Sequence, residues 1–255
     1  RNTTTTNGIL NYTQSGGNVI INGNNALATK AKLEVLNGGS VFNMSGGTLT
    51  IVRGGGTTYG DLYLRPASSS VTGGTIVFTN VIPNTIQNYL MDSNIPLNNL
   101  TVTGAAGAGV NAVLGLVVSP LELNGTLTLN NARSIFNSNS INVSIKGDLV
   151  NSGSYNFGTN TTTFNGGTQT ISGGSVTNFN NLIVSSANSL TVNSDFFVNQ
   201  DLFIGSGTLI LGNKKLTLAG NIVNNGTYTD DNNLGGISLS GAVQQQISGT
   251  GAFGK

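Results

Sequence analysis

Short phrases recur along the sequence, and this recurrence limits the possible folds more than any other feature. Residues 12–21 return as residues 42–51, with a Gly-Gly pair near the centre of both copies. Farther on, residues 97–102 return as residues 179–184. Repetition of this kind is typical of stacked supersecondary units, each of which buries its apolar face against its neighbours.

Two kinds of repeat divide the chain. Residues 1–97 carry units of about 30 residues, whereas residues 98–179 and 180–255 are two copies of a unit of about 80 residues. The change of repeat type brings no linker or charge run, so we expect a single segment over residues 1–255. Neither end carries the polar cap that terminal repeats need, and we therefore expect the segment to be an excerpt of a longer protein.

Within the repeats, apolar and polar residues alternate over short runs, as at Leu127 and Leu129 or at Leu209 and Leu211. Alternation with a period of two indicates strands with one buried face, and no stretch shows the period of about 3.6 that a helix requires. Turn-forming Asn-Gly pairs, such as Asn124-Gly125, separate the runs. The sequence therefore predicts an all-β fold.

Asn-Gly pairs also mark antiparallel hairpins, so a β-sandwich is the alternative architecture. Strands recur about every 7–10 residues, closer than the spacing of about 8–12 residues in sandwiches. A repeat of about 20–30 residues fits one coil of three short strands. We therefore predict a right-handed parallel β-helix (β-solenoid) of about 12 rungs and about 55 Å in length.

The low charge of the chain supports this choice. Only 7% of residues are charged, compared with about 25% in typical domains. In a solenoid, outward side chains stack about 4.8 Å apart, where rows of Asn, Ser and Thr are tolerated but like charges repel. Asn also tolerates the left-handed conformation at corners, and its amide can bond to the next rung.

Composition excludes several functions. The net charge of +1 gives no basis for binding nucleic acid or an anionic membrane. The absence of Cys and His removes disulfides, zinc sites and the Ser-His-Asp triad. No apolar run approaches the roughly 18 residues that span a bilayer. We therefore expect no cofactor, no nucleic-acid partner and no membrane insertion.

Residues 147–157, 162–173 and 179–184 resemble the repeats of large Bacteroidota surface proteins, the giant adhesins and gliding-motility adhesins exported by the type 9 secretion system. The resemblance is clear over residues 97–255 and looser over residues 1–96. It implies a secreted protein on the bacterial cell surface, attached through a terminal region absent from this chain. The C-terminal sorting domain of such proteins is likewise not part of this sequence.

The same resemblance implies the partners: extracellular surfaces or glycans, outer-membrane secretion and attachment proteins, and neighbouring copies in a filament. The function predicted is a stiff stalk or surface-binding rod, and not an enzyme. One alternative is a carbohydrate-active β-helix enzyme, a lyase or hydrolase, which needs paired carboxylates in a groove. The nine acids are scattered: Glu34, Asp61, Asp92, Glu122, Asp148, Asp195, Asp201, Asp230 and Asp231.

A second alternative is an ice-binding surface, because Thr residues alternate in two places. These residues are Thr48 and Thr50 in one run, and Thr159, Thr161 and Thr163 in another. Such alternation places the side chains on one face of a strand. In a chain this rich in Thr, chance placement on a strand face is the favoured explanation of the pattern.

Two groups of residues are candidate sites, with no catalytic residue among them. The segment 53–65 is glycine-rich and holds side chains that can stack on and hydrogen-bond to a sugar: Arg53, Tyr59, Asp61, Tyr63 and Arg65. It lacks the Lys-Ser/Thr pair of a phosphate-binding loop, and a purely structural loop is the alternative. Asp230 and Asp231 are a candidate calcium site, for which a polar turn is the alternative.

Overall fold

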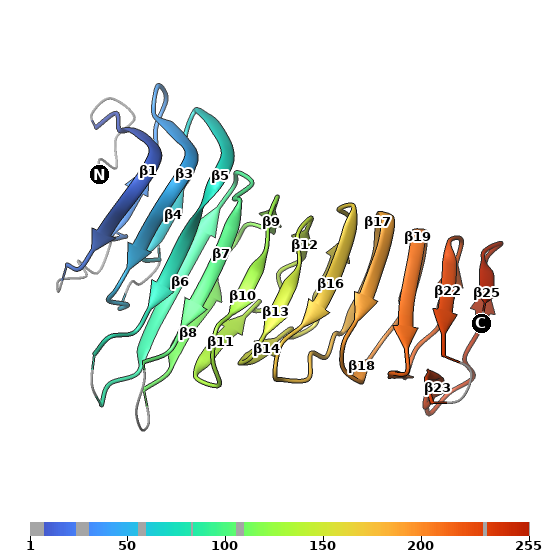
Figure 1. Cartoon of the computed structure of the whole chain (residues 1–255). Helices are drawn as coiled ribbons and strands as arrows, with labels where there is room; N and C mark the ends of the chain where they lie inside the picture. The colour runs from blue at the N-terminus through green and yellow to red at the C-terminus, as the bar shows by residue number, and fades with distance from the viewer. Residues whose placement is uncertain are drawn as a thin grey trace.

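The computed structural model describes residues 8–23, 31–55, 60–82, 84–105, 110–231 and 234–254. Within these ranges every regular element is a strand, and the strands form sheets of 16, 6 and 3 members (Figure 1). Every pairing between these strands is parallel, including the first (β1 with β3) and the last (β22 with β25). The all-β prediction is confirmed, and the antiparallel sandwich is excluded for the described residues.

The strands are short except where one runs through a corner. The 16-stranded sheet contains β1 (Asn11–Ile21), β3 (Val41–Ile51), β5 (Ser68–Thr79), β7 (Asn99–Thr103), β9 (Leu121–Leu123), β10 (Leu127–Leu129), β12 (Val143–Ile145), β13 (Leu149–Asn151), β15 (Thr161–Phe164), β16 (Thr168–Ser172), β17 (Asn181–Val192), β19 (Leu202–Gly212), β21 (Ile222–Asn224), β22 (Thr227–Asp230), β24 (Ile247–Ser248) and β25 (Ala252–Gly254). The six-stranded sheet contains β2 (Leu33–Val35), β4 (Leu62–Leu64), β6 (Gln87–Ser93), β8 (Ala112–Leu116), β11 (Ser134–Asn137) and β14 (Ser154–Asn156). The three-stranded sheet contains β18 (Phe196–Val198), β20 (Lys215–Leu218) and β23 (Gly236–Leu239).

Partner residues in neighbouring strands lie one coil of the chain apart. The coil is longer near the N-terminal end, where Val19 pairs with Leu49, than farther along, where Leu182 pairs with Leu202. Successive coils stack along one axis from the N-terminal to the C-terminal end (Figure 1). This arrangement of long parallel sheets is compatible with a β-solenoid.

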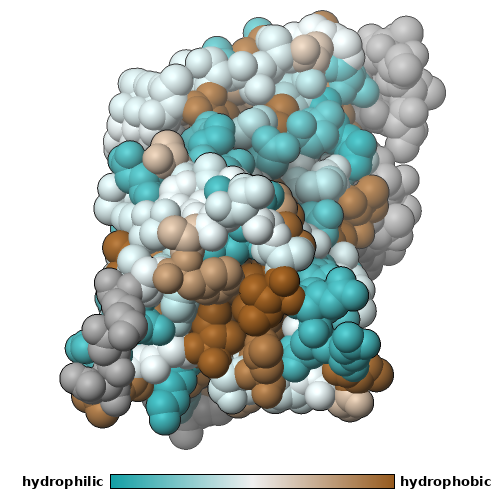
Figure 2. Space-filling view, turned by 90° about the vertical axis from the view of Figure 1, so that its right-hand side faces the viewer, coloured by the Kyte–Doolittle hydropathy of each residue, from teal (hydrophilic) through white to brown (hydrophobic). Residues whose placement is uncertain are grey.

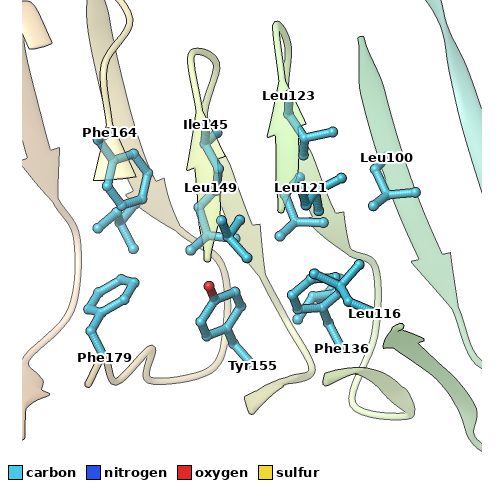
Figure 3. Packing of buried hydrophobic residues seen from close by; sticks show 14 of the residues in the cluster. Leu100, Leu116, Leu121, Leu123, Phe136, Ile145, Leu149, Tyr155, Phe164 and Phe179 are labelled. Atoms are coloured by element: carbon cyan, nitrogen blue, oxygen red, sulfur yellow. The ribbon is translucent and has the colours of Figure 1, made fainter. Parts of the chain in front are cut away.

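A single apolar core runs through the stack, from Val35 in β2 to Tyr228 in β22. Three-residue strands such as β10 bury their two outer side chains and turn the middle one outward, which is the predicted period of two. In β14 the same alternation buries the middle residue, Tyr155, instead. Figure 3 shows the rings of Phe136, Tyr155 and Phe179 in one row. Their centroids lie 5.5 Å and 5.9 Å apart. Each such buried side chain contributes about 1.5–3 kcal/mol.

The core is also visible at the C-terminal end of the stack. Figure 2 looks onto this end and shows apolar side chains gathered at its centre. Ile247 and Phe253 are 55% and 49% exposed there, because no coil among the described residues covers them. Burial in a stack of this kind depends on the next coil rather than on the coil itself.

The recurring Gly-Gly phrase marks a corner within the long strands β1, β3 and β5. Gly47 has a φ of 79°, which is left-handed, and a Cβ on it would lie 2.6 Å from the carbonyl carbon and oxygen of Gly16. Only glycine combines this conformation with so close an approach of two backbones. The sequence repeat therefore reflects the requirement of each coil to turn beneath its neighbour.

Buried amides hold several corners together. The Nε2 of Gln169 donates to the carbonyls of Ile145 and Gly147, and its Oε1 accepts hydrogen bonds from Gly166 N at 2.7 Å and Ser186 Oγ at 2.8 Å. The Gln169 side chain is fully buried, and these contacts satisfy all its hydrogen-bonding groups. Gln245 repeats the pattern at another corner.

Outward-facing side chains form a second set of links between coils. Asn181 Oδ1 accepts a hydrogen bond from the backbone N–H of Asp201 at 3.1 Å. In the following coils, Asp201 Oδ1 accepts the N–H of Asn221 at 2.7 Å, and Asn221 Oδ1 accepts the N–H of Gln246 at 2.9 Å. The one carboxylate in this row lies between two amides, so like charges do not meet. The prediction that amides bond to the neighbouring coil is confirmed.

Buried tyrosines should make the fold sensitive to alkali. Burial raises the pKa of Tyr155, and burial together with the nearby Asp61 carboxylate raises that of Tyr89. The unfolded chain ionises its tyrosines near pH 10, before the folded chain does, so stability should be constant below about pH 10 and fall above it. Urea-unfolding midpoints at about pH 8 and about pH 11 check this. Equal midpoints would contradict it, and Tyr155→Phe should flatten the decline.

Candidate functional site

Arg65 and Asp92 form an ion pair at the surface of the six-stranded sheet. Arg65 follows β4 and Asp92 lies in β6, with Nε and Nη2 of Arg65 at 2.8 Å and 2.7 Å from Asp92 Oδ2. The second carboxylate oxygen accepts the N–H of Ser119 at 2.8 Å, and Arg65 Nη2 also donates to Ser119 Oγ at 3.0 Å. The three residues come from consecutive coils, so this cluster ties three coils together.

The carboxylate is the buried member of the pair. The side chain of Asp92 is 2% exposed and that of Arg65 is 36% exposed. The hydrogen bond to Asp92 raises the pKa of Arg65 further, so its charge is permanent. A carboxylate that holds a guanidinium and a backbone N–H is already satisfied and unsuited to act as a general acid or base.

Tyr63 lies beside this pair. In the sheet it is in register with Glu34 on one side and Asp92 on the other. The Cζ atom of Arg65 is 5.5 Å from the centre of the Tyr63 ring, which is within cation–π distance. Tyr63 and Arg65 are therefore the two sequence-predicted residues that the structure brings together.

Asp61 is placed differently, because it is fully buried. Its Oδ2 accepts the N–H of Leu90 at 2.9 Å, and its own N–H donates to the carbonyl of Leu90. On the other side its carbonyl accepts hydrogen bonds from Lys32 N and Leu33 N. Asp61 thus joins three coils, and the predicted contact of its carboxylate with a sugar stays a prediction.

Arg53 makes a different contact, in which its Nε donates to Asn22 Oδ1 at 3.2 Å across an exposed surface. Tyr59 lies outside the described residues. Sequence reasoning missed Asp92 and Ser119 as members of the cluster. Arg65, Asp92 and Ser119 lie 27 residues apart in turn. The strand register differs from this interval, since Tyr63 pairs with Asp92 and Met91 with Leu116, so the spacing gave no signal for the cluster.

A small pocket adjoins the cluster at Ser119. It measures about 190 Å³ and is lined by Asn94, Ile95, Ser119, Pro120 and Glu122. Small-molecule sites usually span about 300–1,000 Å³. Among the described residues, Nη1 of Arg65 has no hydrogen-bond partner. The cluster and pocket can therefore hydrogen-bond a small polar group, such as part of a sugar, in a shallow site.

One carboxylate oxygen of Asp230 and the backbone carbonyl of Asp231 accept hydrogen bonds within the chain. Asp230 Oδ2 accepts the hydroxyl of Tyr228 at 2.6 Å, and the carbonyl of Asp231 accepts hydrogen bonds from Leu234 N and Gly235 N. The described part of the chain contains no group of three or more acidic, His or Cys side chains placed to hold a metal ion. These contacts favour the polar-turn interpretation of Asp230 and Asp231.

Several other acids cap backbone groups of the next coil. Asp148, Asp195 and Asp201 accept the N–H groups of Thr170, Lys215 and Asn221 at 2.7–2.8 Å. In each case a side-chain acceptor from the neighbouring coil satisfies a backbone N–H in or next to a strand. The acids are therefore distributed along the stack as structural acceptors.

Removal of Arg65 tests whether the cluster stabilises the stack. Arg65→Ala should lower the free energy of unfolding by about 2 kcal/mol, because the buried Asp92 loses hydrogen bonds from a charged donor. Arg53→Ala, which removes one exposed hydrogen bond, should change it by less than about 0.5 kcal/mol. Urea unfolding followed by circular dichroism compares the two, and equal effects would contradict the structural role of the cluster.

No family model matches this chain, and neither the curated proteins nor the solved structures contain a significant match. The described residues include no helix long and apolar enough to cross a membrane.

Proposed function

We propose that this chain is a structural and adhesive segment of a secreted bacterial cell-surface protein, acting as a stiff stalk or surface-binding rod. The observation that carries the proposal is one unbroken parallel ladder. It passes through β1, β3, β5, β7, β10, β13, β16, β17, β19, β22 and β25 in that order. Eleven strands at about 4.8 Å per step span about 48 Å.

Three layers of interaction support stiffness along this ladder. Backbone hydrogen bonds join every coil to the next, the apolar core is continuous from Val35 to Tyr228, and amide side chains such as Gln169 close the corners. An interior packed in this way does not deform gradually. We propose in addition that the coil is a right-handed β-solenoid of about 12 rungs, since nearly all parallel crossovers have this hand.

The setting proposed for the rod follows from the sequence resemblance to type 9-secreted giant adhesins. Export across the outer membrane would place it on the cell surface, with surfaces or glycans, outer-membrane attachment proteins and neighbouring copies as partners. The low fraction of charged residues in the chain, 7%, suits contact with uncharged surfaces. The exposed guanidinium of Arg65 and its pocket offer one polar contact point on such a rod.

Pulling the chain by its two ends tests the mechanical part of the proposal. A stiff stack should resist extension and then yield in steps. Each step should release the length of one extended coil, about 70 Å for the shorter coils and about 100 Å for the longer ones. Smooth extension without such steps would rule out a stalk.

A second experiment tests adhesion against catalysis. Beads coated with the chain should remain attached under flow to polysaccharide-coated or abiotic surfaces longer than beads coated with an unrelated globular protein. Prolonged incubation with acidic and neutral polysaccharides should produce no new reducing or unsaturated ends. Release of such products would replace the adhesive function with that of a lyase or hydrolase.

A further inference from the structure

One outward face of the 16-stranded sheet carries hydroxyl-bearing, β-branched side chains in register. In β3, β5 and β7, Thr48 pairs with Thr75, and Thr50, Val77 and Thr101 follow one another across the strands. The row continues to Thr128 in β10, while Thr79 pairs with Thr103 beside it. We call this set the threonine grid: Thr48, Thr50, Thr75, Thr79, Thr101, Thr103 and Thr128.

The core fixes the direction of these side chains. Leu49, Ile76, Leu100 and Leu127 alternate with them along the strands and are buried, whereas the grid residues are all partly exposed. The strands β3, β5, β7 and β10 lie side by side in this order (Figure 1). None of the four contains a charged residue. The grid is thus an uncharged patch of one continuous sheet.

The hydroxyl groups of the grid are unused within the chain. No grid hydroxyl has a hydrogen-bond partner among the residues that the structure describes. Neighbouring side chains at the edge differ, since Asn99 Oδ1 accepts Thr126 N at 2.9 Å and Thr126 Oγ1 accepts Asp148 N at 3.3 Å. The polar side chains at the edge of the grid are therefore used in hydrogen bonds within the chain, whereas the grid hydroxyls remain available to donate to and accept from water.

The geometry of a β-sheet makes the grid periodic in two directions. Outward side-chain positions repeat about every 4.8 Å from strand to strand and about every 6.6 Å along a strand. Thr occupies most of these positions, with Val77 and Asn99 as the interruptions. Rows of oxygen atoms in hexagonal ice repeat on a similar scale. The methyl groups favour loss of mobile water, while the hydroxyls can hydrogen-bond to water held in fixed positions.

We propose that the threonine grid is an ice-binding surface. The grid contains no aromatic ring, which argues against stacking on sugars and favours a lattice of water as the ligand. Its side chains are β-branched and stand on a hydrogen-bonded ladder, so little conformational entropy is lost when a rigid lattice binds. This activity is separate from the mechanical role of the stack, and either can fail without the other.

Ice-affinity partitioning of the purified chain tests the proposal. Slowly grown ice should enrich the chain several-fold over an unrelated globular protein, and crystals in its solution should show thermal hysteresis. Thr101→Lys at the centre of the grid should abolish both effects. Thr163→Lys is the matched control, because Thr163 also points outward from this sheet, in β15 beside Ile183, but outside the grid.

A more conservative variant distinguishes two causes of lost ice binding: a poorer match to the ice lattice, and disturbance of the surface by a long charged side chain. The triple variant Thr50→Ser, Thr101→Ser, Thr128→Ser keeps the hydroxyls and removes the methyls, and should lose most of the ice affinity. Circular dichroism of each variant should match that of the original chain. Exclusion of the original chain from ice, or equal losses in Thr101→Lys and Thr163→Lys, would overturn the proposal.

Discussion

Alanine at Gly173 should destabilise the fold by about 3 kcal/mol or more, one of the largest effects of any single substitution in this chain. Gly173 has a φ of 114°, and a Cβ on it would lie 2.1 Å, 2.3 Å and 2.6 Å from the O, C and N atoms of Asn151. All three are backbone atoms of the neighbouring coil, so no flexible side chain can move aside. An alanine at this position can therefore be accommodated only if the two neighbouring coils move apart.

Gly174 is the matched control for this substitution. A Cβ on Gly174 meets no atom within 4 Å, so Gly174→Ala should change the free energy of unfolding by less than about 1 kcal/mol. Urea unfolding of the two variants, followed by circular dichroism, measures the difference. Similar midpoints for both would show that the coils are not in close contact at this corner.

Phe179→Ala is expected to cost about 3–5 kcal/mol, because it removes a large side chain from the centre of the core. The Phe179 ring is fully buried and lies 5.9 Å, 6.2 Å and 6.0 Å from the rings of Tyr155, Phe164 and Phe196. These partners come from neighbouring coils on both sides. The cavity would therefore weaken stacking in both directions along the axis.

Phe197→Ala provides the comparison, since Phe197 is 50% exposed on the outward side of β18. Its loss should cost about 1 kcal/mol or less. Thermal unfolding followed by circular dichroism should show a much lower midpoint for Phe179→Ala than for Phe197→Ala. A larger effect at Phe197 would mean that the inward and outward faces of this part of the chain had been assigned in reverse.

The strand pattern was predictable because it is local. Alternating residues such as Leu127 and Leu129 specify a strand and its buried face without reference to the remainder of the chain. Parallel pairing followed from repeat length and low charge, which are also properties of the sequence alone. The type of residue at the corners was also predictable, since Asn37 and Asn139 adopt the expected left-handed backbone conformation.

The structural reason for the longer repeats could not be predicted from the sequence and became clear only from the structure. Residues 147–153 resemble residues 220–226 because both contain the same corner. Asn151 and Asn224 are fully buried, and the Oδ1 of each accepts the N–H of a glycine two positions later. Their Nδ2 groups donate to Thr177 Oγ1 and to the carbonyl of Ala252 in the next coil. The similarity therefore records a shared local requirement, and the long repeat unit of residues 98–179 and 180–255 stays a prediction.

The candidate site was predictable only in part, because contacts between coils depend on register. Tyr63 and Arg65 are close in sequence and share one surface. Asp92 joins them only because β4 and β6 pair with Tyr63 opposite Asp92, and nearby coils differ from this one in length. No local pattern fixes that length, so neither the partner of Arg65 nor the burial of Asp61 could be read from composition or spacing.

The change in coil length along the axis affects which gene duplications and deletions preserve the fold. Thr162, Leu182, Leu202 and Ile222 are successive partners at equal intervals along the chain. Duplication or loss of one such interval in the gene leaves every inward residue of this stretch facing inward. Val19, Leu49, Ile76 and Leu100 are also successive partners, but their intervals are unequal. A duplication or loss there keeps core side chains inward only if its length matches the particular coil affected. Gene variants of different length should therefore arise mainly in the second half of the chain.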